Sequence, residues 1–172
     1  GWIQSSPVVE GLGFPLGTRG QMFYLNPERP NALVPRKRPR ATLTPSLVTR
    51  DGEPFMVFGT PGGDCQDQWT LQFFLNYVEF GMDVQEALDA PTVHCEHFPS
   101  SFYPRTARPG GMRAEGRIPH DVIEKLRRRG HKATVIGDWV NGKVLGIHYD
   151  KAGGLILGGA SAKNKIAYAL GW

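Results

Sequence analysis

The strongest hydrophobic pattern in the chain begins near residue 66 and predicts an amphipathic helix. Its apolar side chains recur at helical spacing and form one broad face, which suits packing on a sheet. They are Trp69, Phe73, Phe74, Tyr77, Val78 and Phe80. Asp64, with Asp67 three residues later, is expected to cap the start of this helix.

Two shorter helices are predicted downstream. Asp83 begins one of them, with Glu86 at the capping-box position, and Pro91 limits its end. The other runs from Pro119, in the first turn, to Gly130. Its narrow apolar stripe leaves its arginines to face solvent or a partner.

Ahead of the long helix, the sequence predicts a β-hairpin. Residues 42–50 and 53–59 are rich in β-forming residues, and Asp51-Gly52 between them suits a tight turn. Residues 1–40 are rich in Gly and Pro and lack a sustained apolar period. We therefore expect covering loops with short strands there.

After the helices, the pattern returns to strands. Residues 131–140, 143–150 and 155–161 are expected to form a three-stranded antiparallel meander, with turns at 141–142 and 151–154. Regular alternation of strands and helices is not predicted, which argues against a doubly wound dinucleotide-binding fold. A layered α+β sandwich with mostly antiparallel sheet fits better.

Length and composition indicate a single domain over residues 1–172. The chain has 172 residues, of which 40% are hydrophobic, and this is enough for one sizeable core. No apolar run approaches the roughly 18 residues that a membrane span needs. The net charge of +4 owes much to basic clusters at 36–40 and 125–129. Neither cluster is interleaved with stacking aromatics, so nucleic-acid binding is not expected.

Gly62 and Gly63 stand between the predicted hairpin and the long helix. Backbone amides at such a junction have no ladder partner, and the absence of Cβ atoms permits close approach of an anion. They suit either a phosphate or the oxyanion formed when a nucleophile attacks an amide or ester. A phosphate loop needs Lys followed by Ser or Thr, whereas Asp64 and Cys65 follow here, so we favour the oxyanion. A purely structural turn that lets strand and helix pack closely stays open.

Candidates for a nucleophile or metal site within the chain are weak. Ser161 lies beside glycines but outside a Gly-x-Ser-x-Gly elbow. Residues 94–98 group two His, one Cys and one Glu in an expected loop, yet no second ligand cluster stands at zinc-site spacing. Cys65 and Cys95 are too few for a disulfide scaffold. We expect no metal and no cofactor.

Four longer motifs, in order along the chain, resemble a known family. They are KRP at 37–39, TLTPSLV at 42–48, FGTPGGD at 58–64 and QEALDAP at 85–91. With the stretches around them they resemble the small subunit of the γ-glutamyltranspeptidase family, particularly its glutathione hydrolase-like bacterial branch. The resemblance runs from about Gly11 to the end of the chain.

This resemblance implies an N-terminal-nucleophile hydrolase with an αββα sandwich. Family members cut themselves into a large and a small subunit, and the new N-terminal Thr of the small subunit attacks a γ-glutamyl amide. Its own α-amine is the base, and water or an acceptor amine resolves the acyl-enzyme. The resemblance assigns Gly62 and Gly63 as oxyanion amides and implies a large-subunit partner from the same precursor.

Other family positions differ in this chain. The nucleophile Thr is expected ahead of Gly1, so we expect the chain alone to be inactive. Two serines of the best-known members correspond to Ala41 and Thr42, which leaves Thr42 as the candidate substrate ligand. An acid that binds the substrate α-amine corresponds to Met22. Losing such a contact would weaken preference for γ-glutamyl groups by about a hundredfold.

Three functions therefore remain open. The leading one is a γ-glutamyl amide hydrolase or transferase acting on glutathione-type substrates. The alternatives are an acylase for glutaryl-type groups and a noncatalytic family member that binds through its basic clusters. Both bacterial cytoplasm and periplasm are compatible with the sequence.

Overall fold

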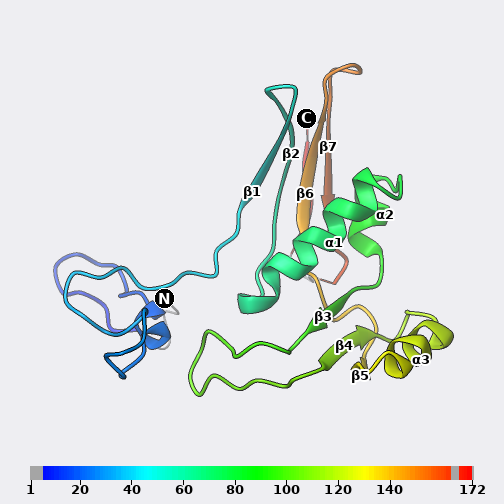
Figure 1. Ribbon diagram of the computed structural model, residues 1–172. Coiled ribbons are helices and arrows are strands. Elements are labelled where there is room, and N and C mark those ends of the chain that lie inside the picture. The colour runs from blue at the N-terminus through cyan, green and yellow to red at the C-terminus, as the bar shows by residue number, and fades with distance from the viewer. Residues whose placement is uncertain (1–5, 164–166, 172) are drawn as a thin grey trace. The chain divides into compact units, whose positions relative to one another are not determined.

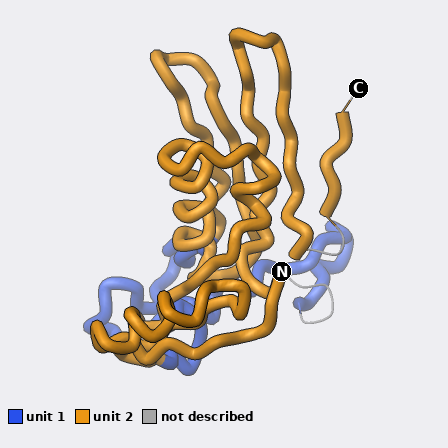
Figure 2. The backbone as a smooth tube through the Cα atoms, turned by 90° about the vertical axis from the view of Figure 1, so that its right-hand side faces the viewer, with its two compact units in different colours: residues 1–42, 100–106 blue, residues 43–99, 107–172 orange. Residues whose placement is uncertain are grey.

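The computed structural model describes residues 6–163 and 167–171, which form two compact units. The first unit comprises residues 1–42 and 100–106, and the second comprises 43–99 and 107–172, as Figure 2 shows in blue and orange. No helix in the described ranges combines the length and apolar character needed to cross a membrane.

The first unit consists mainly of loops around one 3-10 helix, η2 (Arg19–Met22). Isolated bridges join Val8 to Pro15 and Tyr24 to Ala32. Among its described residues, no strand is longer than these single bridges. The guanidinium of Arg105 donates to the carbonyl of Met22 at 3.0 Å and stacks 3.8 Å from the Tyr24 ring centroid. These contacts attach residues 100–106 to the N-terminal loops.

The second unit contains a four-stranded antiparallel sheet in the order β1-β2-β6-β7 (Figure 1). Its strands are β1 (Ser46–Arg50), β2 (Glu53–Gly59), β6 (Leu145–Asp150) and β7 (Leu155–Ala160). Asp51 and Gly52 close the β1–β2 hairpin with φ of 53° and 81°, which confirms the predicted turn.

Helices α1 (Gln66–Val78) and α2 (Val84–Asp89) pack on one face of this sheet (Figure 1). Gly146 and Gly159, paired across β6 and β7, permit this close packing. A Cβ on Gly146 would lie 2.5 Å from the Phe73 ring, and one on Gly159 would lie 2.7 Å from Leu88. The resulting core gathers Phe55, Met56, Trp69, Phe73, Val84, Ala87, Leu88 and Val144.

Of the two N-terminal caps predicted for α1 and α2, the structure contains one. The predicted capping box of α2 is confirmed, because Asp83 accepts from the Glu86 amide while Glu86 accepts from that of Asp83. The predicted Asp64 cap of α1 is wrong. The chain reaches α1 through a 3-10 turn, η3 (Gly63–Cys65), and the N-cap residue Cys65 makes no side-chain cap bond.

A second sheet has the order β3-β4-β5 and corrects the predicted meander. Its strands are β3 (Val93–Cys95), β4 (Gly111–Glu115) and β5 (Lys132–Ile136). β5 lies parallel to β4 because α3 (His120–Arg128) forms a crossover between them, with Ile123 buried against the sheet. Only β6 and β7 of the predicted meander pair with each other.

Glutamine side chains join the helices to the free edges of both sheets. The Gln68 amide both donates to and accepts from the Cys95 backbone, at 3.1 and 2.7 Å. Gln72 does the same at Val93, at 2.8 and 3.0 Å. Gln85 of α2 likewise pairs with Ala160 on β7, at 3.0 and 3.2 Å. These bonds fix α1 against β3 and α2 against β7.

Candidate active site at the Gly62–Gly63 turn

The two glycines lie directly after the sheet and ahead of α1. β2 ends at Gly59, and the chain then passes through Gly62, with φ 147° and ψ 15°, and Gly63, with φ 58°. Residues other than glycine rarely adopt these backbone angles. The backbone path therefore explains the residue type at both positions.

Trp69, one turn into α1, packs beneath Gly62. A Cβ on Gly62 would lie 2.2 Å from Cζ3 and 3.0 Å from Cε3 of the Trp69 ring. The six-membered ring of the indole thus occupies the space that a side chain would need. Close packing of strand and helix, the structural alternative raised from the sequence, is a real part of the role of Gly62.

The same turn leaves two adjacent amides available to a ligand. The Gly62 carbonyl accepts from the Cys65 amide at 3.1 Å, while no backbone carbonyl of the described loops and turns accepts from the Gly62 or Gly63 amide. Gly62 is exposed and Gly63 is half-buried. Two N–H groups at the positive end of a helix suit an oxyanion.

The remaining substrate-site predictions fall in the first unit. Thr42 is 7% exposed, and Met22 is 1% exposed at the end of η2. Gly62 and Gly63 belong to the second unit. The assignment of Thr42 as a substrate ligand therefore stays a prediction.

The segment 94–98 is organised by strand pairing and ion pairs. His94 and Cys95 belong to β3, so the predicted loop is wrong at these positions. Glu96 accepts from Arg108 and Arg113 at 3.0 Å each. Burial alone would raise the pKa of Glu96, but these two arginines hold it below its usual value. Within the described residues, no three His, Cys, Asp or Glu side chains are placed to bind a metal.

A buried charge cluster lies behind the site and was not predicted. Glu115, at the end of β4, accepts from the backbone amides of Thr92 and Asn141 at 3.1 and 3.0 Å. Its carboxylate also pairs with Arg117 at 2.9 Å and with Lys163 at 3.2 Å. Burial would raise the pKa of Glu115, but the amides and the Lys163 charge hold it below its usual value.

Ser161, which the sequence analysis considered as a nucleophile, lies next to this charge cluster. Ser161 is 1% exposed after β7, and its hydroxyl accepts from the Lys163 amide at 3.3 Å. No histidine contact at its hydroxyl is among the described hydrogen bonds. The structure thus gives Ser161 a local role at the end of the sheet.

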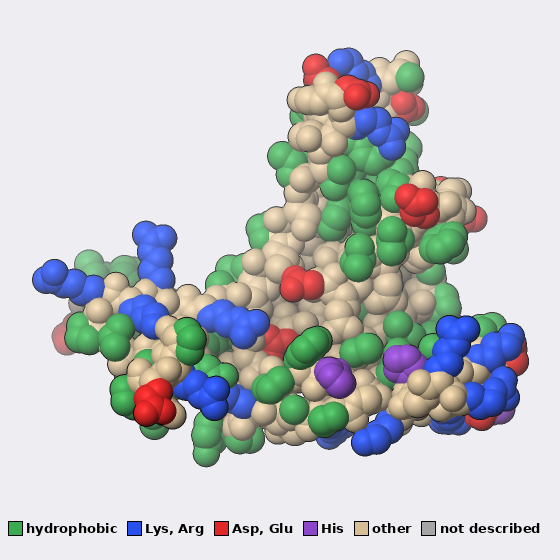
Figure 3. Space-filling model, viewed as in Figure 1, with side chains coloured by type: hydrophobic (Ala, Val, Ile, Leu, Met, Phe, Trp, Pro, Cys, Tyr) green, Lys and Arg blue, Asp and Glu red, His purple; other side chains and the backbone are tan. Residues whose placement is uncertain are grey.

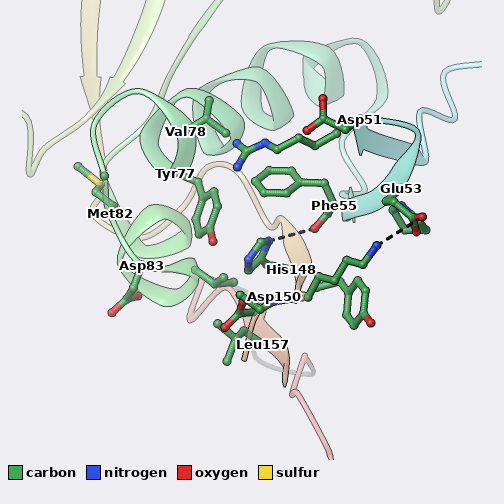
Figure 4. A pocket seen from close by; sticks show the side chains of 17 residues that line it. Asp51, Glu53, Phe55, Tyr77, Val78, Met82, Asp83, His148, Asp150 and Leu157 are labelled. Carbon is green, nitrogen blue, oxygen red and sulfur yellow. Dashed lines mark hydrogen bonds and ion pairs between the residues drawn. The ribbon is translucent and has the colours of Figure 1, made fainter. Parts of the chain in front are cut away.

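A separate pocket of about 700 Å³ lies at the other end of β2 (Figure 4). Phe55, Tyr77 and His148 point toward one another in it, and His148 Nδ1 lies 3.0 Å from the Phe55 carbonyl. Gly59 lies six residues after Glu53, where β2 begins, a span of roughly 20 Å. This pocket is therefore not part of the glycine site.

The basic cluster at 125–129 lies on the surface of α3, at the lower right of Figure 3. Lys125 pairs with Asp121 at 2.8 Å, and Arg127 pairs with Glu124 at 2.7 Å. Part of its charge is thus balanced on the same helix.

Comparison with known proteins identifies the family. The γ-glutamyltranspeptidase family model matches residues 1–172. The glutathione hydrolase-like YwrD proenzyme of Bacillus subtilis is 33% identical over 161 residues, which cover 92% of this chain and 29% of that protein. The chain thus spans less than a third of the length of this relative.

Two solved structures share the fold. One, named LmbA2991HD, is 49% identical with a TM-score of 0.91, and the match covers 100% of this chain and 30% of that one. The other, a cephalosporin acylase from Bacillus halodurans, is 32% identical with a TM-score of 0.76, over 88% of this chain and 26% of that one. These matches confirm the expected α+β fold of the N-terminal-nucleophile hydrolase type. With the whole-chain family match, they show that the chain belongs to the γ-glutamyltranspeptidase family.

Proposed function

We propose that this chain is the small-subunit portion of an amide hydrolase or transferase that acts on γ-glutamyl compounds of the glutathione type. The observation that carries the proposal is the pair of accessible amides at Gly62 and Gly63, ahead of α1. The names of the relatives, several of them glutathione hydrolase proenzymes, agree with this chemistry.

The glycine pair would act in each tetrahedral step. A Thr hydroxyl, supplied by a residue outside the 172 positions, attacks the amide carbon, and the carbonyl oxygen becomes an oxyanion. The Gly62 and Gly63 amides donate to this oxygen and stabilise the charge. When the C–N bond breaks, the departing amine takes a proton and an acyl ester remains. Water or an acceptor amine then attacks the ester and releases the Thr hydroxyl.

A large subunit from the same precursor is the proposed partner. The face of the four-stranded sheet opposite α1 and α2 bears a cross-strand row of exposed apolar residues, Leu47, Val57 and Ile147. They line a groove of about 1460 Å³. A second sheet packed on this face would bury the row and complete an αββα sandwich.

The proposal leaves two acyl groups as candidates, γ-glutamyl and glutaryl. A γ-glutamyl substrate carries an α-amine, and buried Met22 stands where the family resemblance implies an acid. One similar solved structure is named a cephalosporin acylase, which supports an acylase as the second candidate, with glutaryl-type groups as its proposed substrates. Thr42 is the proposed substrate ligand under either reading.

The test uses the complete protein, expressed as one precursor. We expect mass spectrometry to find two chains, with an N-terminal Thr on the smaller one. We also expect p-nitroaniline release from γ-glutamyl-p-nitroanilide to exceed release from glutaryl-p-nitroanilide. The opposite order would establish the acylase. An uncut precursor that hydrolyses neither compound would indicate a noncatalytic family member. The 172-residue chain alone should hydrolyse neither.

A further inference from the structure

Among the described residues, four buried polar atoms on side chains around Trp69 have no hydrogen-bond partner. They are Trp69 Nε1, Thr92 Oγ1, His94 Nδ1 and Asn141 Nδ2. Their residues are 9%, 5%, 8% and 5% exposed. An unsatisfied buried polar group costs free energy, so four such atoms in one region call for a shared partner.

The surrounding geometry places these side chains together. Gly142 lies between Thr92 and Trp69, because a Cβ there would lie 3.3 Å from Thr92 Oγ1 and 3.5 Å from Trp69 Cγ. Asn141 directly precedes Gly142. The His94 ring stands nearly perpendicular to the Trp69 indole, with centroids 5.5 Å apart. Thr92 directly precedes β3, two residues before His94, a spacing that favours one face of the chain for the two side chains.

Glu115 binds the backbone of two of the four residues. Its carboxylate accepts from the backbone amides of both Thr92 and Asn141, and Arg117 and Lys163 neutralise it. One carboxylate therefore holds the backbones of the two segments near each other.

The four atoms match the bonding capacity of one water molecule. Indole Nε1–H and an Asn141 amide hydrogen can donate to the two lone pairs of the water oxygen. The water can then donate to the Thr92 hydroxyl and to His94 Nδ1. Burial, the largest influence on His94, lowers the pKa of its imidazole, so the neutral ring can keep Nδ1 as an acceptor. Buried waters ordinarily make about three such bonds.

We propose that Trp69, Thr92, His94 and Asn141 bind one ordered water behind the Gly62–Gly63 turn, and that Trp69 thereby positions the Gly62 amide. The pyrrole ring of Trp69 faces Gly142 and the water, and its six-membered ring contacts Gly62. The indole thus connects the polar cluster to the turn. The positioning role rests on the proposed oxyanion function, whereas the water site does not.

The water site is tested in the complete protein with a matched pair at one position. Thr92→Val keeps the shape and removes the hydroxyl, and Thr92→Ser keeps the hydroxyl. If the hydroxyl bonds a water, the thermal midpoint should fall by about 2–4 °C more in Thr92→Val than in Thr92→Ser. A higher midpoint in Thr92→Val would show that the hydroxyl is unpaired and would overturn the site. A high-resolution crystal structure without density between the four atoms would do the same.

The positioning role is tested by kinetics on the better p-nitroanilide substrate. Trp69→Phe removes Nε1–H and part of the Gly62 contact, so we expect kcat to fall about tenfold while KM changes by less than about twofold. Phe73→Leu, one turn further along α1 and packed on Gly146, is the control. It should lower the thermal midpoint without lowering kcat. Equal kcat in Trp69→Phe and wild type would refute the positioning role.

If the wild-type complete protein hydrolyses no amide, the proposed function fails. The Thr92 pair and the crystal structure still decide whether the water site exists. The two failures are thus distinguishable.

Discussion

Replacing Gly62 by alanine should disrupt the turn far more than replacing a glycine with a similarly unusual backbone elsewhere. A φ of 147° with ψ of 15° costs a residue with a Cβ about 1–3 kcal/mol. The new Cβ would also lie 2.2 Å from Trp69 Cζ3, and relief of such overpacking costs about 1–3 kcal/mol more. We therefore expect Gly62→Ala to destabilise the complete protein by about 2–6 kcal/mol.

Gly81→Ala provides the matched control. Gly81 has a φ of 68°, and nothing lies within 4 Å of an added Cβ. This variant should lose only about 1–2 kcal/mol. Thermal unfolding, followed by circular dichroism, should give a clearly lower midpoint for Gly62→Ala than for Gly81→Ala.

A double-mutant cycle isolates the contact itself. In the double variant Gly62→Ala, Trp69→Phe, the smaller ring leaves room for the Cβ, so the combined loss should be less than the sum of the single losses by about 1 kcal/mol or more. Additive losses, or equal midpoints for Gly62→Ala and Gly81→Ala, would refute the assignment of Trp69 as the limit on this position.

Three further outcomes follow from the buried charges, the caps and the thiols, each measured on the complete protein. Glu115→Gln should lower the free energy of unfolding by about 3–5 kcal/mol, because Lys163 stays buried without its carboxylate. The folded-state pKa of Glu115 lies below its ordinary value, so wild type should lose this stability as pH falls through that range, whereas the Gln variant should show a weaker acid-side decline in urea titrations. Asp83→Ala removes a capping box and should cost about 0.5–2 kcal/mol, with α2 amides exchanging faster in hydrogen-exchange measurements. Burial and the nearby Asp64 charge raise the pKa of the Cys65 thiol, so iodoacetamide at pH 8 should alkylate exposed Cys95 first, and equal rates by mass spectrometry would contradict this order.

Local signals in the sequence predicted the elements that depend on neighbouring residues. The Asp51-Gly52 turn and the Asp83 capping box each rest on contacts within four residues, and both are present. The long apolar period predicted α1, but Phe80 lies beyond the end of this helix at Val78 and is exposed, so the predicted apolar face is wrong at that position. The Gly62–Gly63 turn was also visible, because a strand, two glycines and a helix follow one another directly.

Elements that depend on distant partners were missed. β4 reads as an unremarkable mixture of small and polar residues, although it is the central strand of the second sheet. Without β4, β5 had no visible partner except the following strands, and the meander was the result. Glu115 looks like a surface acid, since Lys163 is far away in sequence. The Trp69 contact with Gly62 was hidden for another reason: helical spacing shows that a residue faces inward but not what it touches.

The hydrogen bonds of Gln68, Gln72 and Gln85 cover part of one edge strand in each sheet. Each side-chain amide offers one donor and one acceptor and so occupies backbone groups that another strand would use. At Val93 and Cys95 of β3, and at Ala160 at the end of β7, the helices therefore oppose intermolecular strand addition. Strand addition at these three positions would first require displacement of a helix, so the contacts that hold α1 and α2 in place also oppose misassembly there.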